Sequence, residues 1–325
     1  MEEHAEQRVD LTLFSGKIGE LKKQIAAVVV GQERTVDLLI TCIIADGHVL
    51  IEGVPGVAKT LLAKLIARLI DARFSRVQFT PDLMPSDVLG TTVFNMKTND
   101  FDFHPGPVFA DVVLVDEINR APAKTQSALF EVMEERQVSI DGTTRRMGEL
   151  YTIMATQNPV EQEGTYKLPE AQLDRFLMKI TVDYPSLEEE VSILERHHAN
   201  AALVKLKDVS PVITRDEILA LRAIMMNHVF VDRTLLQYIA LIVQQTRTSK
   251  AVFLGASPRA SVAMMQCAKA YALLQGRDFV TPEDIKFVAP YVLQHRLILT
   301  AEAEMEGYSP VKVTRRLIDK VEVPK

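Results

Sequence analysis

The chain has 325 residues, of which 47% are hydrophobic and 25% charged, and its formal net charge is −6 at pH 7. This composition is typical of a globular protein with a large core, and the acidic balance argues against a nucleic-acid-binding role. No apolar run approaches the roughly 20 residues of a membrane-spanning helix, and the acidic start, MEEHAEQ, lacks the basic segment of a signal peptide.

The segment from His48 to Thr60, HVLIEGVPGVAKT, is an apolar run that breaks into a Gly/Pro turn and closes on Lys-Thr. This order is typical of a loop that cradles phosphate groups between a strand and a helix. Gly53 and Gly56 let backbone N–H groups converge on a phosphate, and Lys59 adds a mobile cation. Thr60 begins a helix whose positive end favours an anion, and its hydroxyl is a ligand for the Mg²⁺ that accompanies ATP. The sequence therefore predicts an ATP site.

One residue departs from the strict phosphate-loop pattern, which has glycine where this chain has Ala58. Alanine is tolerated there if its φ angle is negative, because its methyl group then restricts the backbone little. Taken alone, the segment is also compatible with a tight strand-to-helix turn that binds nothing.

Four apolar residues, Val112 to Val115, predict a buried strand that ends in two adjacent carboxylates, Asp116 and Glu117. Open α/β sheets bind ligands at the carboxyl ends of their strands. Asp116 is predicted to hold Mg²⁺, directly or through water, and Glu117 to orient the water that attacks the γ-phosphate. A strand that ends in a solvated turn is the alternative, but two such motifs in one chain favour catalysis.

The segment from Tyr151 to Thr156 predicts a further strand, which runs into Gln157-Asn158-Pro159. The Asn158 amide is then close to the predicted γ-phosphate position and able to sense it. The alternative is that Asn158 ends the strand and starts a turn.

Arg259 lies in the first turn of a helix that Ser257 caps and Pro258 begins. A cation at this position opposes the helix dipole and needs a compensating anion. The anion is either a nucleotide phosphate or a nearby Asp or Glu. If the anion is a nucleotide phosphate, contact with it would make the orientation of the helix that carries Arg259 depend on which nucleotide is bound.

Five strand-like segments alternate with helical patterns in the first part of the chain, which predicts a parallel sheet with helices on both faces. They are His48 to Glu52, Ser75 to Phe79, Val112 to Asp116, Tyr151 to Thr156 and Met178 to Val182. From Leu187 onward the patterns are helical, including Asp216 to His228, Arg233 to Thr246 and a helix that starts at Thr281-Pro282. We therefore predict an α/β nucleotide-binding domain over residues 1–184 and a smaller all-α lid domain over residues 185–325.

Two insertions have the alternation and turn residues of β-hairpins. One runs from Phe94 to Phe109 with its turn at Asn99-Asp100, and the other from Gln137 to Thr152 around Asp141-Gly142. Arg145 and Arg146 follow the second turn and are able to grip an acidic segment, although a solvated hairpin tip is the more frequent meaning of two arginines. We expect both hairpins to face a partner.

These residues give the chain a close resemblance to the AAA+ ATPases, and within them to the MoxR family, in the helix-2-insert group that is related to magnesium chelatase ATPase subunits. The resemblance covers nearly all of the chain, and alanine at the position of Ala58 is ordinary in that family. It rests on VVGQE at Val29 to Glu33, GVPGVAKT at Gly53 to Thr60, FTPDLMPSDVLG at Phe79 to Gly90, VDEINRAPAKTQSALFEVMEE at Val115 to Glu135, ATQNPVEQEGTYKLPEAQLDRF at Ala155 to Phe176, and GASPRA at Gly255 to Ala260.

The resemblance implies a Walker A loop at Gly53 to Thr60, Walker B at Asp116 and Glu117, sensor 1 at Asn158 and sensor 2 at Arg259. The nucleotide-binding residues that it implies are Val30, Gly31, Gln32, Gly53, Val54, Pro55, Gly56, Val57, Ala58, Lys59, Thr60, Leu61 and Arg259. The catalytic residues are Lys59, Glu117, Asn158, Arg175 and Arg259, and the Mg²⁺ ligands are Thr60 and Asp116. Arg175 resembles an arginine finger that projects into the nucleotide site of the neighbouring subunit, whereas the residues alone indicate a surface ion pair between Asp174 and Arg175. Arg120 is a further candidate for contacts across that interface.

The function that follows is ATP hydrolysis, with ATP/ADP and Mg²⁺ as cofactors, by a homo-oligomeric ring, expected to be a hexamer, that remodels or matures client proteins. The family resemblance also implies a partner with a von Willebrand factor A domain. A DNA or RNA motor is the first alternative, but the net charge and the lack of Trp argue against it. A nucleotide-gated scaffold is the second, and Glu117 argues against it. Two distant cysteines in apolar surroundings, Cys42 and Cys267, favour free thiols and a cytoplasmic protein.

Overall fold

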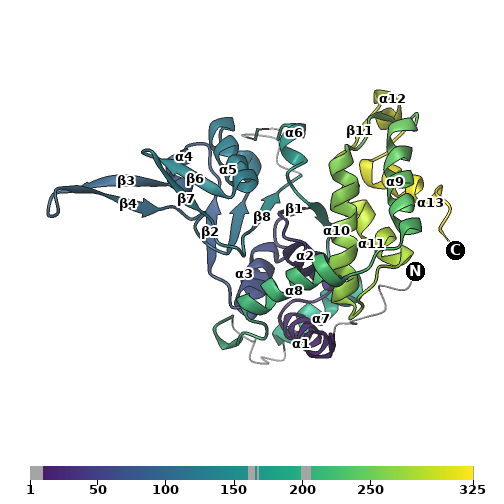
Figure 1. Cartoon of the computed structure of the whole chain (residues 1–325), viewed down its shortest axis with the longest axis horizontal. Coiled ribbons are helices and arrows are strands. Elements are labelled where there is room, and N and C mark those ends of the chain that lie inside the picture. The colour runs from purple at the N-terminus through teal and green to yellow at the C-terminus, as the bar shows by residue number, and fades with distance from the viewer. Residues whose placement is uncertain (1–9, 160–164, 167, 199–205, 325) are drawn as a thin grey trace.

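The computed structural model describes residues 10–159, 165–166, 168–198 and 206–324 (Figure 1). Within these ranges the chain forms a five-stranded sheet, three two-stranded ribbons and the helices that surround the sheet and make up the C-terminal part. None of the described helices combines the length and the apolar character that a bilayer crossing requires.

The central sheet has the strand order β2-β5-β8-β1-β9, and every neighbouring pair is parallel. Its strands are β1 (Val49–Gly53), β2 (Phe74–Gln78), β5 (Val112–Asp116), β8 (Thr152–Gln157) and β9 (Met178–Val182). Each lies within one residue of a predicted segment. The inner strands β5, β8 and β1 are short apolar runs bounded by turns, as buried parallel strands are. The register pairs Gln78 of β2 with Asp116 of β5.

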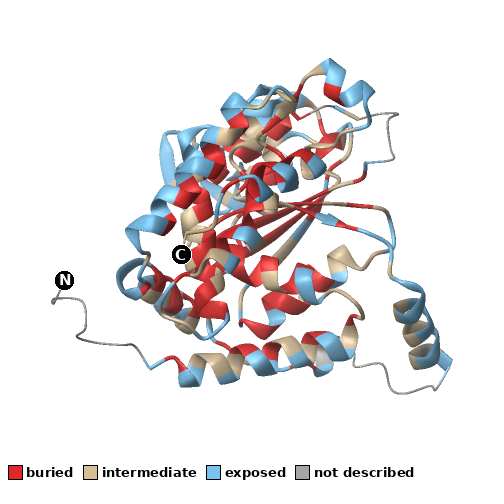
Figure 2. Cartoon of the chain, turned by 90° about the vertical axis from the view of Figure 1, so that its right-hand side faces the viewer, coloured by how far each residue is buried: buried red, intermediate tan, exposed pale blue. Residues whose placement is uncertain are grey.

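Side chains of the strands alternate between two hydrophobic cores, one on each face of the sheet. Figure 2 shows buried residues, in red, along the strands and on the helices that flank them. Val49 and Ile51 of β1 belong to the core shared with the N-terminal and C-terminal helices, whereas Leu50 belongs to the core shared with Phe130 of α5 (Ala123–Glu135). The predicted fold class, a parallel α/β sheet covered on both faces and followed by a helical region, is confirmed.

The helices that precede and connect the strands position the ends of the sheet. They are α1 (Thr12–Val28), α2 (Glu33–Ile44), α3 (Lys59–Leu69), the short α4 (Pro85–Leu89) and α6 (Glu170–Leu173), and the 3-10 turn η1 (Ile118–Arg120). In α3 the apolar residues that recur at helical spacing, Leu62, Leu65, Ile66 and Leu69, are buried. This burial fixes the helix that follows the predicted phosphate loop.

Both predicted hairpins are present, and the longer one projects far from the body of the molecule (Figure 1). Strand β3 (Gly90–Asn95) pairs with β4 (Asp100–Pro105), and β6 (Gln137–Ile140) pairs with β7 (Thr143–Arg146). The first begins at Gly90, four residues earlier than predicted. Positive φ angles at Asn99, Asp141 and Gly142 confirm the turn positions, since these residue types adopt the left-handed conformation readily.

In the described residues after β9, the regular elements are helices apart from one small ribbon. The elements are α7 (Leu187–His198), η2 (Leu206–Asp208), α8 (Arg215–His228), α9 (Arg233–Thr248), β10 (Val252–Leu254), α10 (Pro258–Leu274), α11 (Pro282–Leu293), β11 (Ile298–Leu299), α12 (Ala301–Met305) and α13 (Pro310–Asp319). Strands β10 and β11 pair with each other. They are too short to show periodicity, so the sequence did not indicate them.

The C-terminal helices dock beside β9, at the edge of the sheet farthest from β2. Helix α10 packs against α2, and α11 packs against β9. Small buried residues such as Ala263 and Ala268 let α10 approach closely. The helical region is therefore held on the side of the sheet that lies away from the two hairpins (Figure 1).

Candidate functional site

The loop between β1 and α3 has the geometry of a phosphate cradle. Strand β1 ends at Gly53 and α3 begins at Lys59, so the N–H groups of the first helical turn point into the loop. Gly56 has a φ of 88°, a conformation that glycine adopts without a steric penalty. The loop lies at the carboxyl ends of the strands, which we call the carboxyl edge of the sheet.

Ala58, the residue before the lysine, caps α3 with φ 58° and ψ 19°. The negative φ expected of an alanine here is therefore not found. The reason is that Ala58 lies outside the helix and makes the turn into it; the helix begins at Lys59, one residue before the predicted start at Thr60. An L-residue pays about 1–2 kcal/mol for this left-handed conformation, so the loop is strained at Ala58.

The Lys59 ammonium group donates hydrogen bonds to the backbone carbonyls of Gly53 and Val54, the latter at 2.9 Å. These contacts hold the ammonium group over the loop, where a bound phosphate would also lie. A phosphate oxygen is a stronger acceptor for an ammonium group than a neutral carbonyl, because the hydrogen bond is charge-assisted on both sides.

Asp116 is buried at the end of β5 and lies close to two hydroxyl groups. Thr156 Oγ1 donates to Oδ1 at 3.1 Å, and Thr60 Oγ1 donates to Oδ2 at 3.4 Å. Arg76 Nε donates to the same Oδ2 at 2.6 Å, so this position already accommodates a cation. Carboxylate and hydroxyl oxygens are the ligands that Mg²⁺ prefers, and Thr60 and Asp116 therefore fit the predicted metal site.

Glu117 follows Asp116 with a φ of 57°, which turns its side chain away from the strand direction. Gln78 Nε2 donates to Glu117 Oε2 at 2.7 Å, and Arg120 Nε lies 3.0 Å from the same oxygen. The backbone N–H of Glu117 donates to Thr156 Oγ1 at 3.0 Å. The predicted catalytic carboxylate is thus held by neutral and cationic donors at the mouth of the loop.

A single groove at the carboxyl edge, here called the phosphate groove, brings most of the predicted residues together. It is lined by Pro55, Gly56, Val57, Ala58, Lys59, Thr60, Leu61, Arg76, Gln78, Asp116, Glu117, Thr156 and Asn158. Asn158 is buried there, directly after β8. The sequence interpretation missed Arg76, Gln78 and Thr156. The alternation of Arg76 and Gln78 with Val77, on the strand that leads to the carboxyl edge, was a signal that could have found the first two.

A second pocket adjoins the phosphate groove at Gly56, Val57, Ala58 and Leu61. Val30 and Gln32, two of the predicted nucleotide-binding residues, line it, and α7 adds Ile193 and Arg196. Gly31 lies between them with φ 71°, and a β-carbon there would meet the Glu189 carboxylate at 2.3 Å. The contribution of α7 was missed, because an amphipathic helix does not reveal from sequence which element it covers.

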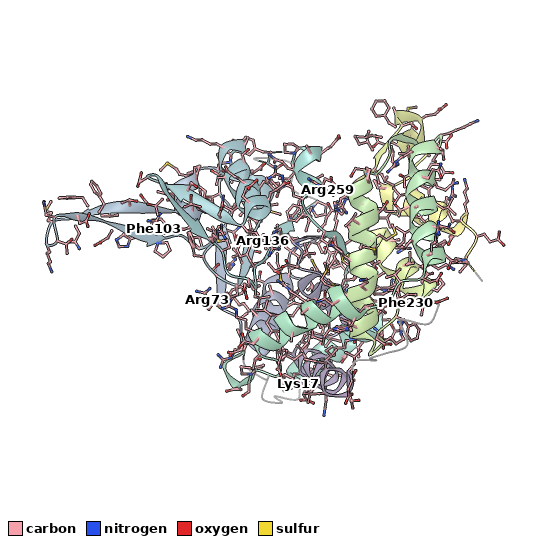
Figure 3. All side chains as sticks on the ribbon, in the orientation of Figure 1. Lys17, Arg73, Phe103, Arg136, Phe230 and Arg259 are labelled. Carbon is pink, nitrogen blue, oxygen red and sulfur yellow. The ribbon has the colours of Figure 1, made fainter. Side chains whose placement is uncertain are left out.

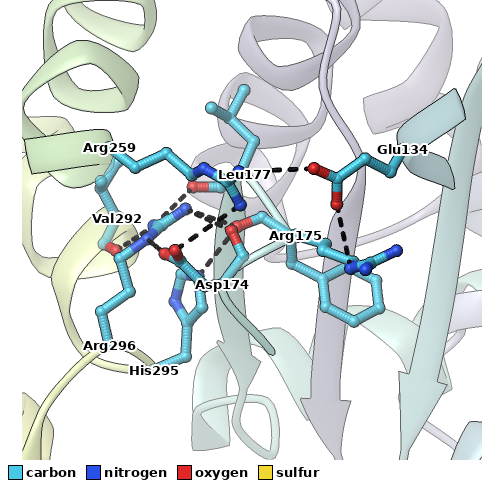
Figure 4. Close-up of polar contacts among 9 residues, drawn as sticks. Glu134, Asp174, Arg175, Leu177, Arg259, Val292, His295 and Arg296 are labelled. Atoms are coloured by element: carbon cyan, nitrogen blue, oxygen red, sulfur yellow. Dashed lines mark hydrogen bonds and ion pairs between the residues drawn. The ribbon is translucent and has the colours of Figure 1, made fainter. Parts of the chain in front are cut away.

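Arg175 and Arg259 lie at the opposite, amino edge of the sheet. Arg175 precedes β9, and Arg259 is in the first turn of α10. Both contact Glu134 in the last turn of α5: Arg175 Nε is 3.1 Å from Oε2, and Arg259 Nη2 is 3.3 Å from Oε1 (Figure 4). Neither arginine is among the described residues that line the phosphate groove or the pocket beside it.

The anion that compensates Arg259 in this chain is therefore protein: Glu134, with Asp174 Oδ2 at 3.9 Å. The expected contact between Arg259 and a nucleotide on its own chain is not formed in this arrangement. A five-residue strand is about 16 Å long, and the arginines and the phosphate loop lie at its two ends. The residues alone indicated an ion pair between Arg175 and Asp174. In the structure Arg175 pairs with Glu134 instead.

Arg296, just after α11, fixes the helical region at this edge. Its Nε donates to Asp174 Oδ1 at 2.6 Å, and its other nitrogens donate to the carbonyls of Asp174, Phe176 and Leu177 (Figure 4). Burial lowers the pKa of the Arg296 guanidinium, and the hydrogen bond to Asp174 opposes that shift. Asp174 is thus committed mainly to Arg296, which leaves Glu134 as the carboxylate that Arg175 and Arg259 share.

Comparisons with known proteins agree with this geometry. A family model described as "ATPase family associated with various cellular activities (AAA)" matches residues 48–178, and an "AAA lid domain" model matches residues 244–317. The fold and the phosphate groove together define an ATPase of the AAA+ class.

The chain is 45% identical to Chaperone MoxR1 of Mycobacterium tuberculosis over 310 residues, which span 93% of this chain and 81% of the relative. It is 46% identical to the uncharacterized protein YeaC of Bacillus subtilis, over 94% and 95% of the two chains. The crystal structure of a "putative ATPase" from Cytophaga hutchinsonii superposes with a TM-score of 0.88 at 41% identity, covering 97% of each chain. The chain belongs to the MoxR family of AAA+ ATPases.

Proposed function

We propose that this protein binds Mg²⁺ and ATP in the phosphate groove, hydrolyses the nucleotide, and uses the free energy to remodel client proteins. The observation that carries the proposal is the convergence of Lys59, Thr60, Asp116, Glu117 and Asn158 on one groove. Phosphoryl transfer needs a positioned nucleophile and neutralised charge, and these side chains supply both.

Each residue has a role that its contacts support. The N–H groups of the phosphate loop and the Lys59 ammonium group bind the phosphates. Thr60 and Asp116 hold Mg²⁺, which when bound neutralises charge on the phosphate oxygens. Asn158 donates from its amide to the γ-phosphate or to the attacking water. Glu117 orients that water as general base, which requires that it exchange its hydrogen bond from Gln78 for one from the water.

The active site is completed by a second copy of the chain. The phosphate groove lies at the carboxyl edge and Arg175 and Arg259 at the amino edge, about 16 Å apart, so one copy cannot bring them together in this arrangement. Two different surfaces that meet make a head-to-tail contact, and such contacts generate a ring when the rotation between copies closes. We infer a homo-oligomeric ring, with six subunits expected from the family, in which Arg175 acts as the finger.

The hairpin β3–β4 is the proposed client contact. Cross-strand pairing places Phe94 opposite Phe101 on one face, with ring centroids 5.2 Å apart. Phe103 lies at the base of this hairpin (Figure 3). Its ring is covered by the Arg145 guanidinium, 3.9 Å from the ring centroid. At the tip, Phe101 is 66% exposed and Met96 is 89% exposed. A two-stranded ribbon with an uncovered aromatic face is a surface that other apolar groups bind.

The partner that this hairpin fits is a polypeptide with apolar side chains. Asp100 and Asp102 lie on its polar face and would repel a phosphate backbone. Arg145 is engaged with Phe103, so it is a poor candidate for phosphate contacts. These features support the protein-remodelling function over the nucleic-acid motor. A partner with a von Willebrand factor A domain is a further proposal, and family membership alone supports it.

ATPase turnover per subunit, measured across a wide protein concentration range, tests the shared site. Turnover should rise with assembly, followed by light scattering, and Arg175→Ala should bind nucleotide but lose the rise. If Arg175→Ala turns over as fast per subunit as the wild type, the finger assignment is wrong. Turnover that does not depend on concentration would indicate a self-sufficient monomer.

The scaffold alternative is tested with Glu117→Gln. The variant should retain nucleotide but hydrolyse it at least about 100-fold more slowly, because the general base is lost. Equal and negligible turnover in the wild type and the variant would favour a nucleotide-gated scaffold.

A further inference from the structure

Glu134 lies between the two arginines that the proposed ring would present to a neighbouring nucleotide. Its carboxylate is the only described group that contacts both, Oε1 with Arg259 and Oε2 with Arg175 (Figure 4). We propose that Glu134 is a positioning residue, which holds these two guanidinium groups side by side for the phosphates bound by the next copy of the chain. The inference rests on the proposed function, since it assumes that the arginines act across a subunit contact.

The first support is that the two arginines come from separate parts of the chain. Arg175 lies just before β9 and Arg259 in α10 of the C-terminal helical region, whereas Glu134 belongs to α5. Neither arginine determines where the other lies. A carboxylate that forms an ion pair with Arg175 through one oxygen and accepts a hydrogen bond from Arg259 on the other sets the spacing of both, much as a phosphate group would.

The second support is the charge of the cluster. Two guanidinium groups that approach one another repel, and the repulsion is substantial where water is partly excluded. Asp174 is committed to Arg296 through the 2.6 Å contact, and its distance to Arg259 is 3.9 Å. Glu134 is therefore the carboxylate that offsets the repulsion between Arg175 and Arg259.

The third support is what remains after that pairing. Three arginines, Arg175, Arg259 and Arg296, stand against two carboxylates, Glu134 and Asp174, so the cluster carries one excess positive charge. The Arg259 side chain is 59% exposed, and the cluster lines an open cavity at the amino edge. Each guanidinium has five N–H donors, more than Glu134 can accept. Glu134 thus aligns the pair without saturating it, and donors remain for an anion that enters from outside the chain.

Mixed assemblies test this inference. Lys59→Ala gives a subunit that supplies arginines but binds no nucleotide, and Arg175→Ala gives one that binds nucleotide but supplies no finger. Neither should turn over ATP alone, and a mixture should recover turnover. Adding Glu134→Gln to the Lys59→Ala subunit should lower the recovered kcat about tenfold, because misplaced groups lose transition-state contact, while KM for ATP stays unchanged. Adding it to the Arg175→Ala subunit should change nothing.

The matched control is Glu135→Gln in the Lys59→Ala subunit, which makes the same charge change at the next, exposed residue of α5 and should leave recovery intact. Glu134→Asp, which restores the carboxylate, should recover part of the loss. A readout without hydrolysis uses the Glu117→Gln background, where Glu134→Gln should raise the protein concentration needed for ATP-dependent assembly by about threefold or more.

The outcomes separate the two levels of the proposal. If the parent mixture recovers no turnover, the shared site itself is wrong. If it recovers turnover and Glu134→Gln has no effect in the arginine-supplying subunit, the positioning role is wrong. Equal losses from Glu134→Gln in either subunit would also overturn it, since they would indicate a general effect on folding.

Discussion

Arg76 and Asp116 form an ion pair in the space where the proposed Mg²⁺ would bind. The Nε to Oδ2 distance is 2.6 Å, and Oδ2 is also the oxygen that Thr60 contacts. Arg76 belongs to the edge strand β2 and its side chain is 46% exposed, whereas the Asp116 side chain is 8% exposed. A cation from solvent can therefore replace the guanidinium without disturbing the sheet, and the two compete for one carboxylate oxygen.

We predict that Arg76→Gln lowers the Mg²⁺ concentration needed for ATP binding. The shift should be about fivefold, since a half-exposed ion pair contributes about 1 kcal/mol. Titration of Mg²⁺ into protein with a fluorescent ATP analogue measures it. Arg73→Gln is the matched control, because Arg73 forms a similar pair with Asp111 at the amino edge. A higher Mg²⁺ requirement in Arg76→Gln would contradict the competition.

Lys59→Ala should lose nucleotide affinity by about 30- to 100-fold, because a charge-assisted hydrogen bond contributes about 2–3 kcal/mol. The two carbonyls that Lys59 contacts would be left to water, so folding stability should change little. Equilibrium binding of labelled ATP and the thermal midpoint without nucleotide measure the two effects. Lys64→Ala, on the same helix, should bind as the wild type does. Undiminished binding by Lys59→Ala would place the phosphates elsewhere.

Ala58→Gly should be at least as stable as the wild type, which is unusual for a change to glycine. The change relieves about 1–2 kcal/mol of strain in the folded state, because glycine adopts the left-handed conformation freely. It also costs about 0.4–1 kcal/mol of stability, because glycine raises the conformational entropy of the unfolded chain. Ala220→Gly, at an exposed position in the middle of α8, should instead lose about 1 kcal/mol. Urea denaturation of both variants gives the comparison. Equal losses of stability would mean that the φ of 58° at Ala58 is not strained.

Stability should fall as the pH decreases from about 6.5 to about 4. His48 is buried with Nε2 donating to Met133 O at 3.1 Å and Nδ1 accepting from Ile153 N at 3.0 Å, and burial lowers its pKa to about 4. Between these pH values the unfolded chain binds a proton that the folded chain does not, so the unfolding free energy falls by up to about 1.4 kcal/mol per pH unit. Burial lowers the pKa of His295 as well, which adds to the effect.

Urea denaturation at several pH values measures this slope. His104→Gln, on the exposed hairpin, should leave it unchanged, whereas His48→Gln should make it shallower. A slope that His48→Gln does not alter would assign the acid sensitivity to other groups.

The sequence predicted the elements whose information is local. The inner strands of the sheet, β1, β5 and β8, are apolar runs, both hairpin turns carry residues that favour a positive φ, and Thr281 caps the helix that was predicted to start at Thr281-Pro282. The phosphate groove followed from the same logic, because the carboxyl ends of parallel strands meet at one edge.

The relationships that the sequence left out depend on packing between distant segments. Gln78 reaches Glu117 only because the register pairs β2 with β5, and the alternation in β2 does not specify that register. Arg259 and Glu134 are 125 residues apart along the chain, and they meet because α10 docks against α2. The sequence left open whether phosphate or protein compensates Arg259, and the docking of α10 decided it within one chain. The Mg²⁺ ligands, the finger role of Arg175 and the cytoplasmic location stay predictions.

The hydrophobic core that runs from β1 through α2 into α10 and α11 gives the helical region a second role besides carrying Arg259. Severing the chain near residue 184, the predicted domain boundary, would expose the buried side chains of α2 and β9 that these helices cover. The fragment would aggregate rather than persist as a simpler nucleotide-binding protein. Chimeras that exchange the helical region between relatives would have to exchange α2 with it, so these two stretches are expected to diverge together in evolution.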